Sequence, residues 1–255
     1  MFPTPLTYPA ASAPQRRIFS GGTYNARDAG RYPIGTSGGS MHGRRLFRAD
    51  ALSDLTEADL TEADGLGIKL VVDLRDPHER DNAPDVEIPG ARNASIMLFE
   101  GTLAGFRADS YPSLEELYQY ILTDHRHKVA EALEQIAETL PSPVLVHCTA
   151  GKDRTGIVVG MIQELVGVPH QWILQDYEAS QHLLNGDFIR RVESVYARAH
   201  VDARKIGAEP IASPAQLLGT TLERIRAEFG SVQGYLVDAG LPLSSVEQIR
   251  RTLTV

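Results

Sequence analysis

The chain has 255 residues, of which 42% are hydrophobic, and this suits one α/β domain with a full core. Its formal net charge of −8 argues against broad nucleic-acid binding, so any attraction for an anionic substrate must be local. The single cysteine excludes an internal disulfide framework, and no apolar run approaches the length of a transmembrane segment.

The start of the chain is predicted to be a flexible arm. Residues 1–17 are rich in Pro, Ala and Ser, and a single domain is predicted to follow at 18–255. The first six residues lack the basic start and the long apolar core of a signal peptide. We therefore expect the chain to be cytoplasmic as synthesised, with secretion by a route without a cleaved signal left open.

Apolar patterning predicts alternating strands and helices. The runs at 68–74 and 144–147 predict buried parallel strands, because such strands are covered on both faces. Apolar side chains at helical spacing from Val129 to Leu140 predict an amphipathic helix that Pro141 ends. The other expectations are strands at 45–48 and 94–99, a helix that Thr56 caps and that Gly65 and Gly67 stop, loops at 30–43 and 76–92, and helices at 113–127, after the strand at 144–147, from Pro169, at 182–205, at 214–229 and at 244–253.

One decapeptide, residues 147–156, carries the chemistry; it reads His-Cys-Thr-Ala-Gly-Lys-Asp-Arg-Thr-Gly. Its Cys148 follows a predicted strand, and Arg154 stands six positions later, where a buried helix begins. Backbone N–H groups in a tight loop at a helix N-terminus stabilise a thiolate, and the same groups bind phosphate oxygens. The spacing therefore predicts a cradle that holds a phosphate over the Cys148 thiolate.

Each position of the decapeptide has a predicted part. Cys148 attacks phosphorus and forms a phosphocysteine that water then hydrolyses, without a metal or a cofactor. Arg154 presents a planar fork to two phosphate oxygens, while Gly151 lets the loop curl. The hydroxyl of Thr155 is placed to donate to the thiolate. The predicted substrate-binding residues are Thr149, Ala150, Gly151, Lys152 and Thr155.

These residues resemble the phosphate-binding loop of the cysteine-dependent protein tyrosine phosphatases. The Lys152-Asp153 pair is similar to that of bacterial members with a phosphoinositide-phosphatase-like loop, a group with mycobacterial representatives. The resemblance spans roughly residues 20–253 and includes the blocks Asn25-Ala26-Arg27-Asp28, Arg45-Leu46-Phe47-Arg48-Ala49, Val72-Asp73-Leu74-Arg75, Glu79-Arg80, Asp176-Tyr177 and Phe229-Gly230-Ser231.

The resemblance implies a fold and a reaction. The fold is that of the cysteine-dependent phosphatases, a central, mostly parallel sheet flanked by helices. The substrate is a phosphotyrosine protein, with phosphoserine, phosphothreonine and phosphoinositides left open as further classes. The resemblance to the mycobacterial members also predicts a helical lid at 182–205, for which an ordinary amphipathic helix pair is the alternative.

Two carboxylates are candidates for the general acid. Asp153 lies beside Arg154, and the resemblance favours it as the proton donor or as the group that orients water. Its alternative role is to hydrogen-bond the backbone and set the shape of the loop. The related enzymes carry an Asp on a separate loop, where this chain has Glu100. Because of that replacement, Asp153 is the preferred candidate.

The residues expected to support the loop are His147, Asp73, Arg75 and Glu100, while Lys152 belongs to the substrate-binding set. Lys152 is predicted to reach phosphate or a second acidic group of a phosphoinositide, with a solvent-facing lysine as the alternative. Asp73 and Arg75 follow a buried strand and are predicted to form a buttressing ion pair, and His147 is predicted to order the loop by hydrogen bonding.

Two other functions remain open. A sulfur transferase uses a similar loop with a cysteine and an arginine, whereas a thiol-relay arsenate reductase would need resolving cysteines that this chain lacks. A catalytically silent phospho-binding module is the third reading, although such modules usually lose the cysteine or the arginine. The sequence does not predict the oligomeric state.

Overall fold

The computed structural model describes residues 10, 14–35, 38–99, 113–184, 186–191 and 215–255. Within them, a central sheet has the strand order β1-β4-β7-β5-β6, and β4, β7, β5 and β6 are parallel, while β1 is an antiparallel edge strand. The strands are β1 (Arg27–Asp28), β4 (Leu46–Ala49), β5 (Leu70–Asp73), β6 (Arg92–Ser95) and β7 (Val144–His147), and a separate hairpin pairs β2 (Pro33–Ile34) with β3 (Gly39–Ser40).

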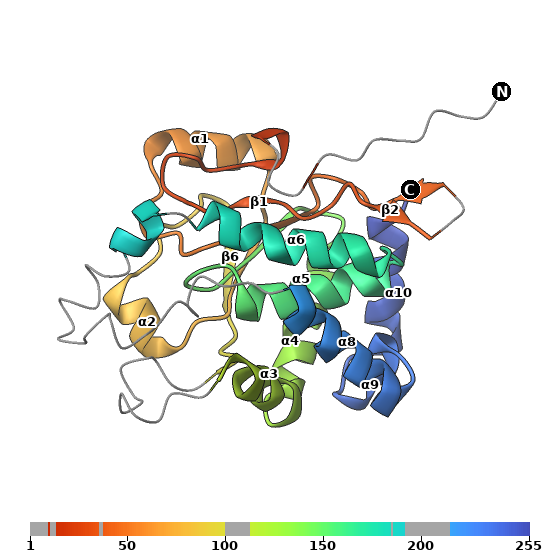
Figure 1. Cartoon of the computed structure of the whole chain (residues 1–255). Coiled ribbons are helices and arrows are strands. Elements are labelled where there is room, and N and C mark those ends of the chain that lie inside the picture. The colour runs from red at the N-terminus through yellow and green to blue at the C-terminus, as the bar shows by residue number, and fades with distance from the viewer. Residues whose placement is uncertain (1–9, 11–13, 36–37, 100–112, 185, 192–214) are drawn as a thin grey trace.

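Helices cover both faces of this sheet (Figure 1). The helical segments are η1 (Pro14–Arg16), α1 (Glu57–Leu66), α2 (Pro77–Asn82), α3 (Leu114–Thr123), α4 (Arg126–Thr139), α5 (Asp153–Leu165), α6 (His170–Leu183), α8 (Ala215–Phe229), α9 (Val232–Asp238) and α10 (Leu243–Leu253). The fold is therefore mixed α/β with a mostly parallel central sheet between helices, as the sequence predicts.

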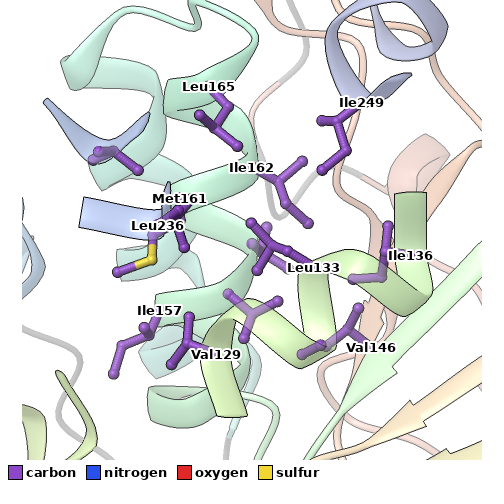
Figure 2. Packing of buried hydrophobic residues seen from close by; sticks show 14 of the residues in the cluster. Val129, Leu133, Ile136, Val146, Ile157, Met161, Ile162, Leu165, Leu236 and Ile249 are labelled. Atoms are coloured by element: carbon purple, nitrogen blue, oxygen red, sulfur yellow. The ribbon is translucent and has the colours of Figure 1, made fainter. Parts of the chain in front are cut away.

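Alternation along the strands divides the core in two. Val144 and Val146 of β7 face the larger cluster, which also contains the buried sides of α4 and α5. Leu145, the residue between them, faces a smaller cluster that includes Ala63 of α1. Figure 2 shows the larger cluster, where Leu133 of α4 lies near side chains of α5. The strand that leads into the decapeptide is thus fixed from both sides.

The register of β7 determines where the loop emerges. His147, its last residue, is paired with Ala49 of β4 on one side and with Asp73 of β5 on the other. Cys148 therefore leaves the sheet between the carboxyl ends of two parallel neighbours. Ligands of open parallel sheets bind at such ends of the strands.

Several predicted elements differ from the observed ones. Residues 76–92 are not only loop, because Asp76 and Glu79 form a capping box that starts α2. The strand expected at 94–99 is β6 and lies earlier, and the turn-rich stretch 30–43 contains the short hairpin. The other helix that the prediction lacks is α9, a short helix whose N-cap is Ser231. Short elements such as these carry too few apolar positions to show a period.

The predicted arm of residues 1–17 extends too far into the chain. The side chain of Arg16 is buried, and its guanidinium donates to the carbonyl oxygen of Gly30 at 2.5 Å and lies 4.2 Å from the centre of the Tyr32 ring. These contacts anchor the chain from η1 onward. Residues 1–9 and 11–13 lie outside the described part of the structure.

Two further expectations fall wholly or partly outside the described residues. Glu100 is not among them, and of the predicted lid at 182–205 only the end of α6 and a helical stretch at 186–191 are described. In that stretch Arg191 pairs with Asp54 at 3.0 Å, and Phe188 makes an edge-to-face ring contact with Tyr24. The lid stays a prediction. In the described residues, no helix combines the length and the apolar character that crossing a membrane requires.

Candidate active site

The site is built on the loop between β7 and α5. Cys148 is 2% exposed and follows the last residue of β7, while α5 begins at Asp153. The first turn of a helix leaves backbone N–H groups without intrahelical partners and carries a partial positive charge. The loop thus brings a nucleophilic side chain and an anion-stabilising helix end into one site.

Gly151 is required for the curl of the loop. Its φ is +63°, a left-handed conformation that side chains disfavour, and a Cβ placed on it would lie 2.2 Å from the carbonyl oxygen of Ala49. The loop therefore packs directly on the end of β4. The part predicted for Gly151 agrees with this geometry.

Side chains from the N-terminal part of the chain hold the loop from outside. Asn25 donates from Nδ2 to the carbonyl oxygens of Ala150 at 2.8 Å and Gly151 at 3.0 Å. Arg48 donates from Nη2 to the same Gly151 oxygen at 2.8 Å. Because a peptide group is planar and trans, carbonyls that face outward turn the N–H groups of the same peptides inward. Asn25 and Arg48 thus keep the amides directed into the cradle.

Arg48 is itself fixed by a buried charge network. Its Nη1 donates to Oδ2 of Asp176 on α6 at 2.6 Å, and Nε of Arg27 donates to Oδ1 of the same carboxylate at 3.2 Å. Burial alone would raise the pKa of Asp176, but the two guanidinium groups hold it at about 2. Burial and the charge of Arg48 in turn lower the pKa of Arg27 to about 10. One buried carboxylate therefore links α6 to the strands that support the loop.

Arg154 is held by the carboxylate of Glu79. This residue lies in one of the blocks that resemble the family, but it has no predicted role. Glu79 of α2 accepts from Arg154 at two points, with Nη1–Oε2 at 2.5 Å and Nη2–Oε1 at 2.7 Å. The hydroxyl of Thr149 also donates to Oε1 of Glu79. Burial alone would raise the pKa of Glu79, but Arg154 lowers it to about 2. Burial alone would lower the pKa of Arg154, but the charge of Glu79 raises it, so the guanidinium stays a cation.

The part of Arg154 that can receive a phosphate follows from this pairing. Glu79 takes one hydrogen of each terminal nitrogen, so Nε and the outer hydrogen of Nη2 form a second donor pair. A guanidinium can bind two oxyanions at once along different edges. Glu79 thus orients the fork and leaves one edge of it for the substrate.

Asp153 lies close to the hydroxyl groups of two tyrosines. Its Oδ1 is 3.4 Å from the hydroxyl of Tyr118 on α3 and 3.4 Å from that of Tyr177 on α6. Its Oδ2 is 3.4 Å from Nζ of Lys152. Lys152 is fully buried, so the alternative of a solvent-facing lysine is wrong, and its predicted reach to phosphate or to a second acidic group stays a prediction.

An ion-pair network lies below the loop. Arg75 donates to Asp73 through Nε and Nη2, both at 2.9 Å, and Nη2 also reaches Asp85 at 2.5 Å. Nε2 of His147 lies 3.3 Å from Asp85, and its Nδ1 is 3.4 Å from the carbonyl oxygen of Cys148. Burial alone would raise the pKa of Asp85, but the nearby His147 and Arg75 hold it below its usual value. The predicted Asp73–Arg75 pair is thus present, and Asp85 extends it.

Three residues of this network have side-chain atoms close enough together to bind a metal ion. Possible ligand atoms of Asp73, Asp85 and His147 lie within 4.8 Å of one another. Arg75 already pairs with both carboxylates, so a cation there would have to displace a buried guanidinium. We therefore interpret the cluster as the support of His147 rather than as a metal centre.

The structure brings most of the predicted site residues together. The hydroxyl oxygen of Thr155 is buried and has no hydrogen-bond partner among the described residues, so its predicted donation to the thiolate stays a prediction. The side chains that contact the loop or His147 and that had no predicted role are Asn25, Arg48, Glu79, Asp85, Tyr118 and Tyr177. The signal for Glu79 was the capping box with Asp76.

Comparisons with known proteins find relatives over most of the chain. The model of the tyrosine phosphatase family matches residues 19–255. A "Tyrosine-protein phosphatase" of Nostoc commune is 31% identical over 213 residues, which cover 80% of this chain and 72% of the relative. The "Triple specificity protein phosphatase PtpB" of Mycobacterium tuberculosis is 26% identical over 273 residues, which cover 91% of this chain and 97% of the relative. The "Inositol diphosphatase DSP2" of Oryza sativa subsp. japonica is 41% identical over 56 residues, which cover 22% of this chain and 26% of the relative.

Proposed function

The chain belongs to the tyrosine phosphatase family, and we propose that residues 147–156 are its catalytic loop. The protein is a cysteine-dependent tyrosine phosphatase that hydrolyses phosphomonoesters through a phosphocysteine. In this proposal Cys148 is the nucleophile and Arg154 binds the phosphate. The observation that carries it is the position of Cys148 at the carboxyl end of β7, with the loop 149–152 between it and the N-terminus of α5 and with Arg154 in the first turn of that helix.

The first step is transfer of the phosphoryl group to sulfur. The Cys148 thiolate attacks phosphorus, an S–P bond forms, and the P–O bond to the leaving phenolate breaks. Arg154 and the loop amides stabilise the charge on the three equatorial oxygens. Asp153 gives its proton to the leaving oxygen, which departs as a neutral alcohol or phenol. The products of this step are the phosphocysteine and the Asp153 carboxylate.

The second step is hydrolysis. The Asp153 carboxylate accepts a proton from a water molecule as that water attacks phosphorus. The S–P bond breaks, and inorganic phosphate and the Cys148 thiolate are released. Asp153 is proposed for both steps because it is the carboxylate on the loop itself, one residue from the phosphate-binding Arg154.

The proposed substrate is a phosphotyrosine protein. Phosphoinositides are a further proposed class, and Lys152, which lies 3.4 Å from Asp153, is the loop residue proposed to bind a second phosphate of such a substrate. The printed names of the mycobacterial and rice relatives keep broader substrate classes as outcomes of a test. Initial rates on a phosphotyrosine peptide, a phosphothreonine peptide and a phosphatidylinositol phosphate would rank the three classes.

A variant of the nucleophile tests the mechanism. Cys148→Ser should abolish turnover of para-nitrophenyl phosphate in the absence of added metal, while inorganic phosphate still binds, since Arg154 and the amides remain. Substantial turnover by the variant would refute Cys148 as the nucleophile. Activity with thiosulfate and none with phosphomonoesters would instead favour the sulfur transferase.

A further inference from the structure

Two buried tyrosines from separate helices meet over the catalytic loop. Tyr118 of α3 donates its hydroxyl hydrogen to the hydroxyl oxygen of Tyr177 of α6 at 2.7 Å. Both hydroxyl oxygens lie 3.4 Å from the same atom, Oδ1 of Asp153. Tyr118 is 2% exposed and Tyr177 is fully buried. The pair lies outside the decapeptide, and the mechanism above does not use it.

The number of hydroxyl hydrogens limits which hydrogen bonds can form among Tyr118, Tyr177 and Asp153. Each hydroxyl has one hydrogen to donate. When Tyr118 gives its hydrogen to Tyr177, the hydrogen of Tyr177 is available for Oδ1 of Asp153. The other carboxylate oxygen faces Nζ of Lys152 at 3.4 Å. Both oxygens of Asp153 therefore have a donor nearby, and these donors can hold the side chain in one orientation.

The tyrosines are fixed donors. Burial raises the pKa of Tyr118 well above its usual value, and burial raises that of Tyr177 as well, so both hydroxyls keep their hydrogens at any working pH. The ring of Tyr177 packs against Gly156, where a Cβ would lie 2.7 Å from Cδ2 of the ring. Removal of the hydroxyl by a phenylalanine substitution would therefore leave the ring in its place.

We propose that Tyr118 and Tyr177 are positioning residues that hold the Asp153 carboxylate in place once its proton has passed to the leaving group. The inference rests on the proposed role of Asp153 as general acid and base. Hydrogen bonds to an ionised group are about twice as strong as those between neutral groups. The pair consequently keeps Asp153 aimed at the leaving oxygen while the proton passes, and afterwards at the attacking water.

The leaving group separates this role from a structural one. Para-nitrophenolate is a good leaving group and needs little protonation, whereas phenolate is a poor one and depends on a general acid. A defect in Asp153 or in its positioning should therefore lower kcat/KM on phenyl phosphate far more than kcat/KM on para-nitrophenyl phosphate. Hydrolysis of the phosphocysteine follows departure of the leaving group and does not enter kcat/KM. The ratio of the two kcat/KM values, measured on one preparation, does not depend on the fraction of folded enzyme.

The test compares this ratio in Tyr118→Phe, Tyr177→Phe and the double variant. Each single change should lower the ratio by only about twofold, because the remaining hydroxyl is already 3.4 Å from Oδ1. The double variant should lower it by about tenfold. Tyr235→Phe is the matched control, since this buried tyrosine donates to the carbonyl oxygen of Leu122, away from the loop, and its ratio should not change.

The same tyrosine changes made in the Asp153→Asn variant complete the test. Asp153→Asn should lower the ratio by about 100-fold, and the double tyrosine change should have no further effect on it there. Equal losses of kcat/KM on both substrates in the double variant would overturn the positioning role, as would a further drop of the ratio in Asp153→Asn. If Asp153→Asn leaves the ratio unchanged while Cys148→Ser is inactive, the inference and the role of Asp153 as acid both fail, while the phosphocysteine mechanism through Cys148 stands.

Discussion

The guanidinium of Arg154 and the carboxylate of Glu79 form a two-point ion pair, with Nη1–Oε2 at 2.5 Å and Nη2–Oε1 at 2.7 Å. The pair joins α2, at the carboxyl end of β5, to the first turn of α5. An arginine has many rotamers, and a phosphate site needs one of them. Glu79 selects that rotamer before the substrate arrives, which lowers the entropy cost of binding.

Removal of the Glu79 charge should weaken catalysis. We expect Glu79→Gln to lower kcat/KM for para-nitrophenyl phosphate by about tenfold or more, because Arg154 loses its fixed orientation and Thr149 its charged acceptor. Glu116→Gln is the control, since Glu116 fills the same capping-box position in α3 without a contact to the loop. A rise in kcat/KM would show instead that Glu79 competes with the phosphate.

The same ion pair should make stability depend on pH. The pKa of Glu79 is about 2 in the folded chain, against its ordinary value of 4.5, so the folded state favours the carboxylate. The stabilisation is present above pH ~4.5 and is lost as the pH falls toward ~2; the shift corresponds to about 3 kcal/mol. Urea unfolding at several pH values should show a smaller acid-dependent loss in Glu79→Gln than in the parent. Identical pH profiles would contradict this.

Gly151→Ala should disrupt the cradle. The added Cβ would lie 2.2 Å from the carbonyl oxygen of Ala49, and φ is +63°, so the loop must open. We expect phosphate binding, measured by calorimetry, to be lost and kcat/KM to fall by about 100-fold or more. Gly65→Ala, in helix α1 with open space around it, should leave binding unchanged and stabilise the fold by about 0.5–1 kcal/mol. Normal phosphate binding by Gly151→Ala would refute the proposed loop geometry.

Asp176 should be essential to the support of the loop. Asp176→Asn leaves Arg27 and Arg48 buried without their shared counter-charge, which should cost about 3–5 kcal/mol in the free energy of unfolding. Asp187→Asn breaks an exposed pair with Arg190 and should cost less than about 1 kcal/mol. Urea denaturation measures both. Similar small losses in the two variants would show that the buried network is not a main support.

The parts of the fold that the sequence predicts are those with local signals. The strand at 144–147, the following loop and α5 lie where the apolar run and the Cys148–Arg154 spacing indicate. The helix capped by Thr56 begins as predicted, because its capping box is written in adjacent residues. These features need no knowledge of distant contacts.

The parts that the sequence does not predict depend on distant contacts. Tyr118 and Tyr177 are 59 positions apart, and only the packing of α3 and α6 brings their hydroxyls together. Arg48 and Asp176 are separated by 128 positions and meet only through the fold. Glu79 is a different case, since the three prolines of 76–92 suggest a loop and conceal the short helix that presents it.

The central claim is that the phosphoryl group passes through Cys148, and trapping the intermediate tests it most directly. Rapid acid quench during turnover of para-nitrophenyl phosphate, followed by peptide mass spectrometry, should find one phosphoryl group on the peptide that contains Cys148. The Cys148→Ser variant should show neither this adduct nor turnover. Steady turnover by the parent with no adduct on Cys148, or with the phosphoryl group on another residue, would contradict the account.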